Sequence, residues 1–498
     1  MQGLIEYAFD RAAGAPLVPG NAVRLLRDAE ENYPPWLEAI RAAERYIYFE
    51  SYIIHEDEVG AQFAYDLICK AQEGVAVRLV YDWLGAVGKT SRRFWRKLQD
   101  GGVQVRCYNP PRISSPLGWL NRDHRKMLSV DGQVGFITGL CVGKAWAGEP
   151  ERGIPPWRDT GIEVRGPAVA DIERAFAEIW SRTGPALPES EPLRRSAMPL
   201  AGDVSMRVVA STPGTAGLLR LDQLVAASAG ERLWLADAYF AGIPSFVQGL
   251  RAAARDGVDV RLLVPGASDI ALIRPISQAG YRPLLEAGVR VFEWKGPMMH
   301  SKTAVADGRW ARVGSSNLNI SSWLGNFELD AVIEDERFAE AMEQSYLADL
   351  ENSTELILRA DRRSSRTRRR MRSGSRTPVR RARGSASRAA AGALRLSHAV
   401  GAAITDRRIL VPTEDRLIAA GGVLLILLAI AAILWPRLVA MPLAVLGLWS
   451  GIVLIAKAYA LRRARNANSR LAGGGFDGGN VSQIATSTDL GPEPRRDG

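Results

Sequence analysis

One feature limits the possible folds of this chain most strongly: its first 360 residues carry the same succession of strands and helices twice. The first copy reads strand, helix, strand, helix, strand over 44–53, 58–73, 74–82, 91–99 and 102–108. The second copy repeats that order over 231–240, 244–256, 257–265, 270–286 and 288–294. Strands alternating with helices of this length are typical of α/β layers, and the repeat is too long for a solenoid. The sequence therefore predicts a duplicated α/β fold whose halves face each other about a pseudo-twofold axis.

Each copy is followed by the same short motif, His-x-Lys-x4-Asp. The six motif residues are His124, Lys126, Asp131, His300, Lys302 and Asp307. The chain has only four histidines and eight lysines, so using both types twice at identical spacing is a specific signal. Residues i and i+2 on a strand point to the same side, so each histidine should project beside its lysine. Facing halves would then bring two imidazoles and two ammonium groups into one active site.

This set of groups favours phosphoryl transfer. Ammonium groups stabilise phosphoryl oxygens, one imidazole can attack phosphorus, and the other can protonate the leaving alkoxide and then deprotonate the acceptor. A covalent phosphohistidine route needs neither a metal nor a cofactor, and no metal-ligand spacing occurs in the sequence. Ser315 and Asn317 follow the second motif and are predicted to bind phosphate oxygens.

A histidine nucleophile needs an acceptor on its second ring nitrogen. Asp159 and Glu328 lie at comparable distances after the two motifs and are the best candidates. Asp131 and Asp307 are counted with the catalytic set as motif members, but the sequence favours for them a role in holding the motif strand or turn.

The remaining sequence suggests further segments around these halves. The predicted boundaries are 1–185 for the first half, 186–205 for a linker, 206–358 for the second half, 359–410 for an Arg-rich disordered linker, 417–456 for a transmembrane hairpin and 466–498 for a disordered tail. The hairpin is predicted because two uncharged apolar arms of bilayer-spanning length flank Pro436-Arg437. Its cationic flanks place both ends in the cytoplasm, with the catalytic body on the inner face of the membrane.

A net charge of +10 is typical of nucleic-acid-binding proteins, but in this chain one segment carries the whole basic excess. Residues 362–395 contain 13 arginines and no acid, which leaves 10 − 13 = −3 for the rest of the chain. No nucleic-acid partner is therefore expected. The arginine run is either a solvated spacer or a segment attracted to an anionic membrane. Cys69, Cys107 and Cys141 fit a reducing compartment, no signal peptide is visible, and the oligomeric state is left open.

The motifs resemble those of the phospholipase D superfamily over roughly residues 20–350. Three phrases are similar to bacterial cardiolipin synthases, of the type without N-terminal membrane helices: WRDTGIEVRGPAV, YFAGIPSFVQGLRAAARDGVDVRLLVPG and VGSSNLNISSW with NFELD. The resemblance implies two α/β/α sandwich halves and the conversion of two phosphatidylglycerols to cardiolipin and glycerol. It also implies that His124 is the nucleophile, backed by Glu328, and that His300 is the general acid/base, backed by Asp159.

Two departures from the family pattern qualify this reading. Cys141 occupies the counterpart position of Asn317, where the family usually has Asn, and a thiol is a weak donor. The second departure is the C-terminal hairpin, because membrane anchors in this family, where present, usually come first. Relative to the second half, the first half has an apolar insertion between its last strand and its motif. Its residues Ile113, Leu117, Trp119 and Leu120 either dip into lipid or pack on the body.

Four functions remain open at this level: cardiolipin synthesis, hydrolysis by a phospholipase D, a phosphodiester nuclease, and a catalytically weakened membrane-tethered binding protein. The hairpin and the near-neutral body disfavour the nuclease, and the complete motifs disfavour the binding protein. The sequence does not decide between transfer and hydrolysis, because that depends on how water is excluded.

Overall fold

The computed structural model describes residues 2–111, 121–188, 191, 195, 198–269 and 273–358, together with 441, 448, 449 and 451. The chain separates into two compact units. The larger comprises Met1–Arg112 and Leu117–Glu414, and the smaller comprises Ile113–Pro116 and Asp415–Gly498. All elements discussed below belong to the larger unit.

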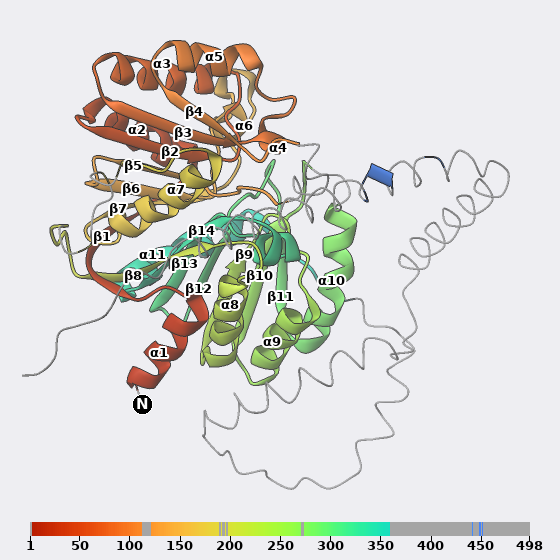
Figure 1. The fold of residues 1–498 in the computed structure, drawn as a ribbon. Coiled ribbons are helices and arrows are strands. Elements are labelled where there is room, and N and C mark those ends of the chain that lie inside the picture. Colours follow the sequence, from red (N-terminus) through yellow and green to blue (C-terminus); the bar gives the residue numbers. More distant parts are fainter. Residues whose placement is uncertain are drawn as a thin grey trace, which may run out of the picture. The chain divides into compact units, whose positions relative to one another are not determined.

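One sheet of fifteen strands runs through this unit (Figure 1). Its strands in the first half are β1 (Val18–Arg27), β2 (Tyr46–Ser51), β3 (Ala76–Asp82), β4 (Gln104–Tyr108), β5 (Met127–Val130), β6 (Val134–Thr138) and β7 (Thr160–Arg165). Those of the second half are β8 (Val204–Ser211), β9 (Arg232–Ala236), β10 (Asp259–Pro265), β11 (Arg290–Trp294), β12 (Thr303–Ala306), β13 (Trp310–Gly314), β14 (Glu328–Glu334) and β15 (Ser353–Glu355).

The strand order shows the duplication directly. The first half is ordered β4-β3-β2-β5-β6-β7-β1, and the second repeats it as β11-β10-β9-β12-β13-β14-β8, with β15 added at the outer edge. The halves join where β1 and β8 pair antiparallel, through Val18 with Met206 and Asn21 with Val204. In each half β2 or β9 pairs parallel to its neighbour on one side and antiparallel to the motif strand on the other. The predicted duplicated α/β fold is therefore present.

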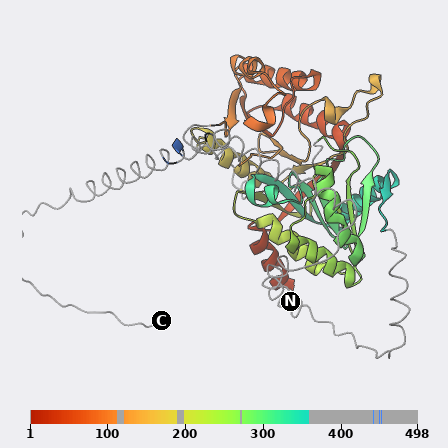
Figure 2. The same cartoon turned by 90° about the vertical axis from the view of Figure 1, so that its right-hand side faces the viewer.

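Helices cover both faces of the sheet. They are α1 (Gln2–Ala13), α2 (Asp28–Ala42), α3 (Glu58–Gln72), α4 (Trp83–Ala86), α5 (Arg92–Asp100), α6 (Lys144–Ala147), α7 (Val169–Thr183), α8 (Gly217–Ser228), α9 (Pro244–Arg255), α10 (Ile273–Ala287) and α11 (Glu336–Glu351), with a short π-helix at Ser321–Gly325. Figure 2 shows most of the first half in red and orange and the second half in green, and α1, in red, lies with the second half, where Ala13 packs in the core with side chains of α8.

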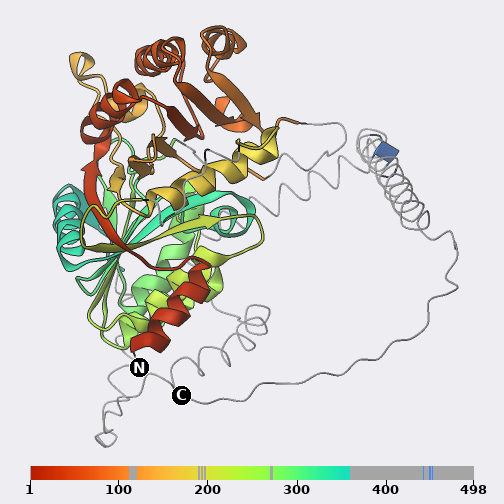
Figure 3. The ribbon, with the colours of Figure 1, turned by 60° about the vertical axis from the view of Figure 1, so that its left-hand side comes forward.

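Alternation along the strands divides the apolar side chains into three cores. Tyr46 and Tyr48 of β2 face a core shared by both halves, which also holds side chains of α7 and α11. Ile47 and Phe49, on the opposite face, join the outer core of the first half with α2, α3 and α5. A third core packs α8 and α9 on the second half. Figure 3 shows α7, in yellow, lying along the sheet on the inner side of the first half. The shared core holds the two halves in one relative position, and it therefore also holds the residues that the halves bring together.

The predicted membrane and loop segments are almost entirely outside the described residues. This applies to the apolar insertion at 112–120, the arginine run at 362–395 and, apart from four residues, the hairpin at 417–456. Within the part of the chain that the structure describes, no helix combines the length and apolarity required to cross a bilayer.

The turn that follows each motif strand is built on the motif aspartate. Asp131 has a positive φ of 54°, and its carboxylate accepts hydrogen bonds from the backbone N–H groups of Glu44 (2.8 Å), Arg45 (2.9 Å) and Tyr46 (2.8 Å). Asp131 therefore connects the end of β5 to the beginning of β2, the strand that pairs with it.

Asp307 repeats this arrangement in the second half. Its φ is 50°, and its carboxylate accepts from the backbone of Gly230, Glu231 and Arg232 at 2.8–2.9 Å. Both aspartates lie at the far end of a four-residue strand from the motif lysine. Both carboxylates make the turn-holding contacts that the sequence favours, and their place among the catalytic residues stays a prediction.

We predict that Asp131→Ala lowers folding stability by about 2–4 kcal/mol, because three backbone donors at a buried strand end lose their acceptor. Unfolding by denaturant, followed by tryptophan fluorescence, measures the change. The matched control is Asp203→Ala, whose side chain is 78% exposed and ion-paired with Arg337. Its effect should stay below about 0.5 kcal/mol. Equal stability of the two variants would contradict the role assigned to Asp131.

Candidate active site

Backbone pairing between the halves positions His124. Its N–H donates to the carbonyl of Phe327 at 2.9 Å, and the N–H of Phe327 donates back to the carbonyl of Arg122 at 2.8 Å. The next residue after Phe327 is Glu328, whose Oε2 lies 2.9 Å from His124 Nδ1. The first half therefore supplies the imidazole and the second half supplies its carboxylate.

The same arrangement occurs at His300 with the halves exchanged. Its N–H donates to the carbonyl of Arg158 at 2.7 Å, and the N–H of Arg158 donates to the carbonyl of Met298 at 2.9 Å. Asp159 follows Arg158, and its Oδ2 lies 2.6 Å from His300 Nδ1. The structure thus contains both cross-half contacts that the family resemblance implies.

The motif lysines lie against the backbone of their own histidines. Lys126 Nζ donates to the carbonyl of His124 at 2.6 Å, and Lys302 Nζ donates to the carbonyl of His300 and lies 2.9 Å from His300 Nδ1. In each motif the lysine side chain lies beside its own histidine, as the i, i+2 spacing predicts. The pairs are not on strands, however, because β5 and β12 begin only after the lysines.

Burial governs the protonation of this cluster. Desolvation lowers the pKa of Lys302 to about 8, assisted by the positive charge of Lys126 from the other motif. Desolvation also lowers the pKa of His300 to about 4, with the Lys302 ammonium acting in the same direction. The pKa of His124 is lowered too, chiefly by burial against the opposing pull of Glu328. Lys126 and Lys302 act electrostatically on the opposite histidines, so the two motifs form one site.

Both carboxylates stay ionised despite their burial. Desolvation alone would raise the pKa of Glu328, but the His124 charge and hydrogen bond, Lys126 and Ser315 lower it below its ordinary value. For Asp159, burial is likewise outweighed by His300 and Lys302, so its pKa is lowered. Each imidazole therefore has an anionic acceptor that fixes its tautomer with the lone pair on Nε2.

The two predicted phosphate-binding residues differ in what they can offer. Ser315 Oγ donates to Glu328 Oε2 at 2.5 Å and accepts from the N–H of Leu329, so its one hydrogen serves the carboxylate and not a phosphate oxygen. Phosphate binding by Ser315 therefore stays a prediction, and the contact that the structure shows is with Glu328. Asn317 is buried, and its Oδ1 has no hydrogen-bond partner among the described residues. Cys141, its counterpart in the first half, is buried as well.

The carboxylate behind His300 has a different set of partners. Trp146 Nε1 donates to Asp159 Oδ2 at 3.3 Å, the oxygen that also contacts His300. Gly139 occupies the position that Ser315 has in the second half, and a Cβ there would lie 2.2 Å from Asp159 Oδ1. Sequence reasoning missed both residues. Aligning the two motifs by their aspartates would have marked Gly139, because it pairs with Ser315, but nothing in the sequence marked Trp146.

Aromatic rings form the walls of the site. Trp146, Trp157 and Tyr239 have ring centroids 5.6–5.8 Å from the His300 ring. The Tyr52 ring is 4.9 Å from that of His124. These rings exclude water from the imidazoles while leaving a polar centre, a setting in which ammonium and hydrogen-bonding groups stabilise charge more strongly than in water.

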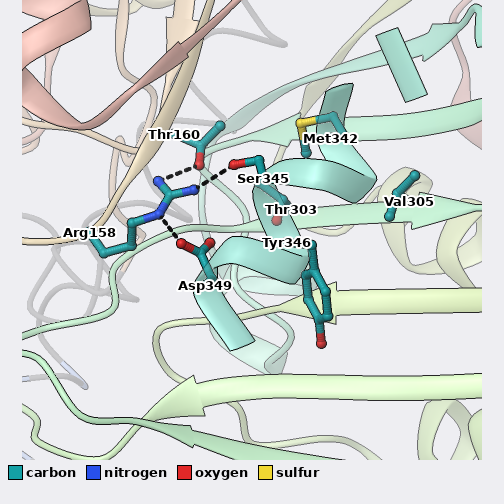
Figure 4. A pocket seen from close by; sticks show the side chains of 8 residues that line it. All are labelled: Arg158, Thr160, Thr303, Val305, Met342, Ser345, Tyr346 and Asp349. Carbon is teal, nitrogen blue, oxygen red and sulfur yellow. Dashed lines mark hydrogen bonds and ion pairs between the residues drawn. The ribbon is translucent and has the colours of Figure 1, made fainter. Parts of the chain in front are cut away.

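A buried ion-pair network supports the Asp159 segment from behind (Figure 4). Arg158 donates to Asp349 Oδ1 at 2.7 Å, to Thr160 Oγ1 at 3.1 Å and to Ser345 Oγ at 3.1 Å, beside a cavity of about 10 Å³. Asp349 and Ser345 come from α11 of the second half, so this guanidinium also connects the halves.

Comparison with known proteins gives one family. The family described as "Cardiolipin synthase, PLD-like domain" matches residues 36–144 and 223–350. A cardiolipin synthase of Alkalihalophilus pseudofirmus is 34% identical over 345 residues, which are 68% of each chain. Cardiolipin synthase A of Pseudomonas fluorescens is 34% identical over 352 residues, 69% of this chain and 71% of that protein.

One solved structure shows similarity of fold. The crystal structure of phosphatidylserine synthase from Haemophilus influenzae matches with a TM-score of 0.54 at 15% identity, over 71% of this chain and 92% of that one.

We predict that Gly139→Ala lowers turnover of a soluble phosphodiester by about 100-fold, because the new methyl group displaces Asp159 from His300 and small misplacements have effects of this size. Gly249→Ala in α9 is the matched control, since a Cβ there meets only Ala226 at an ordinary 3.7 Å. Circular dichroism should show both variants folded. A Gly139→Ala variant with unchanged turnover would contradict the tight fit of Asp159.

We also predict an alkaline limit to catalysis. Lys302 is an ammonium below its pKa of about 8 and loses its charge as the pH rises through that value, so kcat/KM for a soluble substrate should fall there. Lys302→Arg should move this limb to much higher pH, because a guanidinium stays protonated, even if its turnover is lower. Lys126→Arg should leave the limb in place. An unmoved limb in Lys302→Arg would show that another group titrates.

Proposed function

The chain belongs to the family of cardiolipin synthases with phospholipase D-like domains, and from this premise we propose that it converts two phosphatidylglycerols into cardiolipin and glycerol. Family membership confirms the resemblance found in the motif phrases. The observation that carries the proposal is the pair of imidazoles, His300 buried and His124 partly buried, each held by a carboxylate of the opposite half. Such a pair supplies a nucleophile and a general acid/base without further groups.

In the first step, His124 attacks the phosphorus of phosphatidylglycerol. Glu328 holds the Nδ1 hydrogen, so the Nε2 lone pair forms the nitrogen–phosphorus bond as the bond from phosphorus to the glycerol oxygen breaks. His300 donates a proton to that oxygen and glycerol leaves. The entering phosphate anion raises the pKa of His300 from its low resting value, and Asp159 stabilises the imidazolium that results.

In the second step, a second phosphatidylglycerol replaces the departed glycerol. His300, now neutral, takes the proton from its terminal hydroxyl. That oxygen attacks phosphorus, the nitrogen–phosphorus bond to His124 breaks, and cardiolipin is released with both histidines restored. Lys126 and Lys302 stabilise the phosphoryl oxygens in both steps, and Asn317 is proposed as a neutral ligand beside them.

Burial of the site favours transfer over hydrolysis. His300 is only 4% exposed and is surrounded by three aromatic rings, so water has restricted access to a phosphohistidine on His124. The alternative is hydrolysis as in a phospholipase D, in which water replaces the second phosphatidylglycerol as the acceptor.

The proposal extends to the membrane. The hairpin at 417–456 would anchor the enzyme in a bacterial inner membrane with the catalytic halves on the cytoplasmic side, where phosphatidylglycerol is an anionic lipid partner. The domain, linker, hairpin and tail boundaries predicted from the sequence are part of this proposal. Its support is the length of the two apolar arms and their cationic flanks.

We predict that the purified protein forms cardiolipin and glycerol from phosphatidylglycerol, read by thin-layer chromatography and mass spectrometry, and that His124→Ala and His300→Ala each abolish the product. Phosphatidic acid in place of cardiolipin would show hydrolysis. Cardiolipin formation by both variants would refute the mechanism.

A better leaving group separates the two histidine roles. With phosphatidyl-p-nitrophenol, departure needs no protonation, so His300→Ala should retain a burst of p-nitrophenol while His124→Ala should show none. A burst in His124→Ala and none in His300→Ala would reverse the assignment of nucleophile and acid.

A further inference from the structure

Helix α4 is fixed directly beside the histidine of the first half. Asp82 caps the helix, since its Oδ1 accepts from the N–H groups of Leu84 (2.8 Å) and Gly85 (3.2 Å). Its other oxygen accepts from the N–H of Asp123 at 3.0 Å. Asp123 precedes His124, so one carboxylate connects the helix to the backbone of the active site.

Close packing makes α4 an outer wall of that site. A Cβ on Gly85 would lie 2.1 Å from the carbonyl oxygen of Tyr52, so the backbones of α4 and Tyr52 are in contact. The ring of Tyr52 in turn packs against His124. Side chains on the outer side of α4 therefore stand at the rim of the site.

Two apolar side chains on this rim are exposed and rigidly held. Leu84 is 39% exposed and Val87 is 52% exposed. The backbone around them is hydrogen-bonded, with Val87 N–H donating to the Leu84 carbonyl at 3.3 Å and Lys89 N–H to the Ala86 carbonyl at 3.0 Å. Single exposed apolar residues are common, so Leu84 and Val87 indicate a binding surface only together with the residues around them.

The neighbours are cations. The exposed basic residues from the end of α4 through α5 are Lys89, Arg92, Arg93, Arg96 and Lys97. Two carboxylates lie beside them: Glu56, which accepts from the N–H of Ser91 at 2.7 Å, and the exposed Asp100 at the end of α5. The chain outside the arginine run has a net charge of −3, so this is a local basic patch on a slightly acidic body.

Helix stability does not explain these charges. Arg92 and Arg93 lie in the first turn of α5, where the helix dipole disfavours cations. Trp95 stacks on Tyr81 at 3.8 Å, which holds the helix and its charges firmly on β3. Exposed cations on a firmly held helix, at a position that the helix dipole disfavours, fit an anionic partner.

We infer that Leu84, Val87, Lys89, Arg92, Arg93 and Arg96, here called the α4–α5 shoulder, seat the first half on an anionic lipid bilayer. The two apolar side chains enter the acyl region while the cations contact lipid phosphates. This inference rests on the proposed function, since it explains how a lipid headgroup reaches His124 from a membrane. Phosphatidylglycerol is anionic, so substrate and docking surface require the same lipid.

The test compares two substrates with the full-length protein: phosphatidylglycerol vesicles, and a short-chain phosphatidylglycerol below its micelle concentration. Leu84→Ser/Val87→Ser and Lys89→Gln/Arg92→Gln/Arg93→Gln/Arg96→Gln should each lose about 10-fold or more on vesicles, since headgroup attraction and apolar insertion both fall. Both should keep wild-type turnover on the soluble lipid. Leu347→Ser, 43% exposed on α11, is the apolar control. The charge control replaces four exposed arginines elsewhere, Arg24, Arg152, Arg174 and Arg337, with Gln.

Equal losses on both substrates, or losses on neither, would overturn the inference. Failure of the wild-type protein to make cardiolipin from either lipid would instead refute the proposed function. Amide hydrogen exchange over residues 83–97 then tests the shoulder without turnover. Protection by phosphatidylglycerol vesicles and not by phosphatidylcholine vesicles is expected. Protection by polyglutamate but not by vesicles would point to an acidic protein partner and overturn the lipid assignment.

Discussion

The site depends on two short backbone pairings between the halves, His124 with Phe327 and His300 with Arg158. In each pairing, the residue that is hydrogen-bonded to the histidine directly precedes the carboxylate residue that contacts the imidazole. Because backbone hydrogen bonds fix both partners, the side-chain contacts that follow need little further ordering. The shared core beneath α7 and α11 and the buried Arg158–Asp349 pair keep the two halves in this register. Neither half contains a complete acid–base pair alone.

Duplication made the halves similar, and a few substitutions made them unequal. Glu328 is bound by a serine hydroxyl, while the shorter Asp159 is bound by an indole and lies where Gly139 leaves room for it. His300 is the more deeply buried histidine and has the larger ring of aromatic neighbours. Such inequality suits a reaction in which one histidine carries the phosphoryl group and the other carries only protons.

Much of the fold could be predicted from the sequence because strand and helix periodicity are local properties. The predicted elements from 44 to 108 and from 231 to 294 agree with the structure to within a few residues at most ends. The strand assigned to His124 and Lys126 was wrong, since the inter-half pairing takes their backbone before β5 begins. The hydrogen bond from Ser315 to Glu328 could not be predicted, because it joins two separate segments and local sequence does not reveal such a contact.

The sequence by itself determined the duplication, the repeated His-x-Lys-x4-Asp motifs and the turn-holding aspartates, because each follows from spacing along the chain. The pairing of each carboxylate with its histidine was implied by the family resemblance and is present in the structure. Only the tertiary structure decided that Ser315 contacts Glu328 and that Trp146 and Gly139 shape the position of Asp159. It also decided that α4, which carries the exposed Leu84, is connected through Asp82 to the backbone that precedes His124. These are contacts between segments far apart in the chain, and their geometry is set by packing, which has no local periodicity to read.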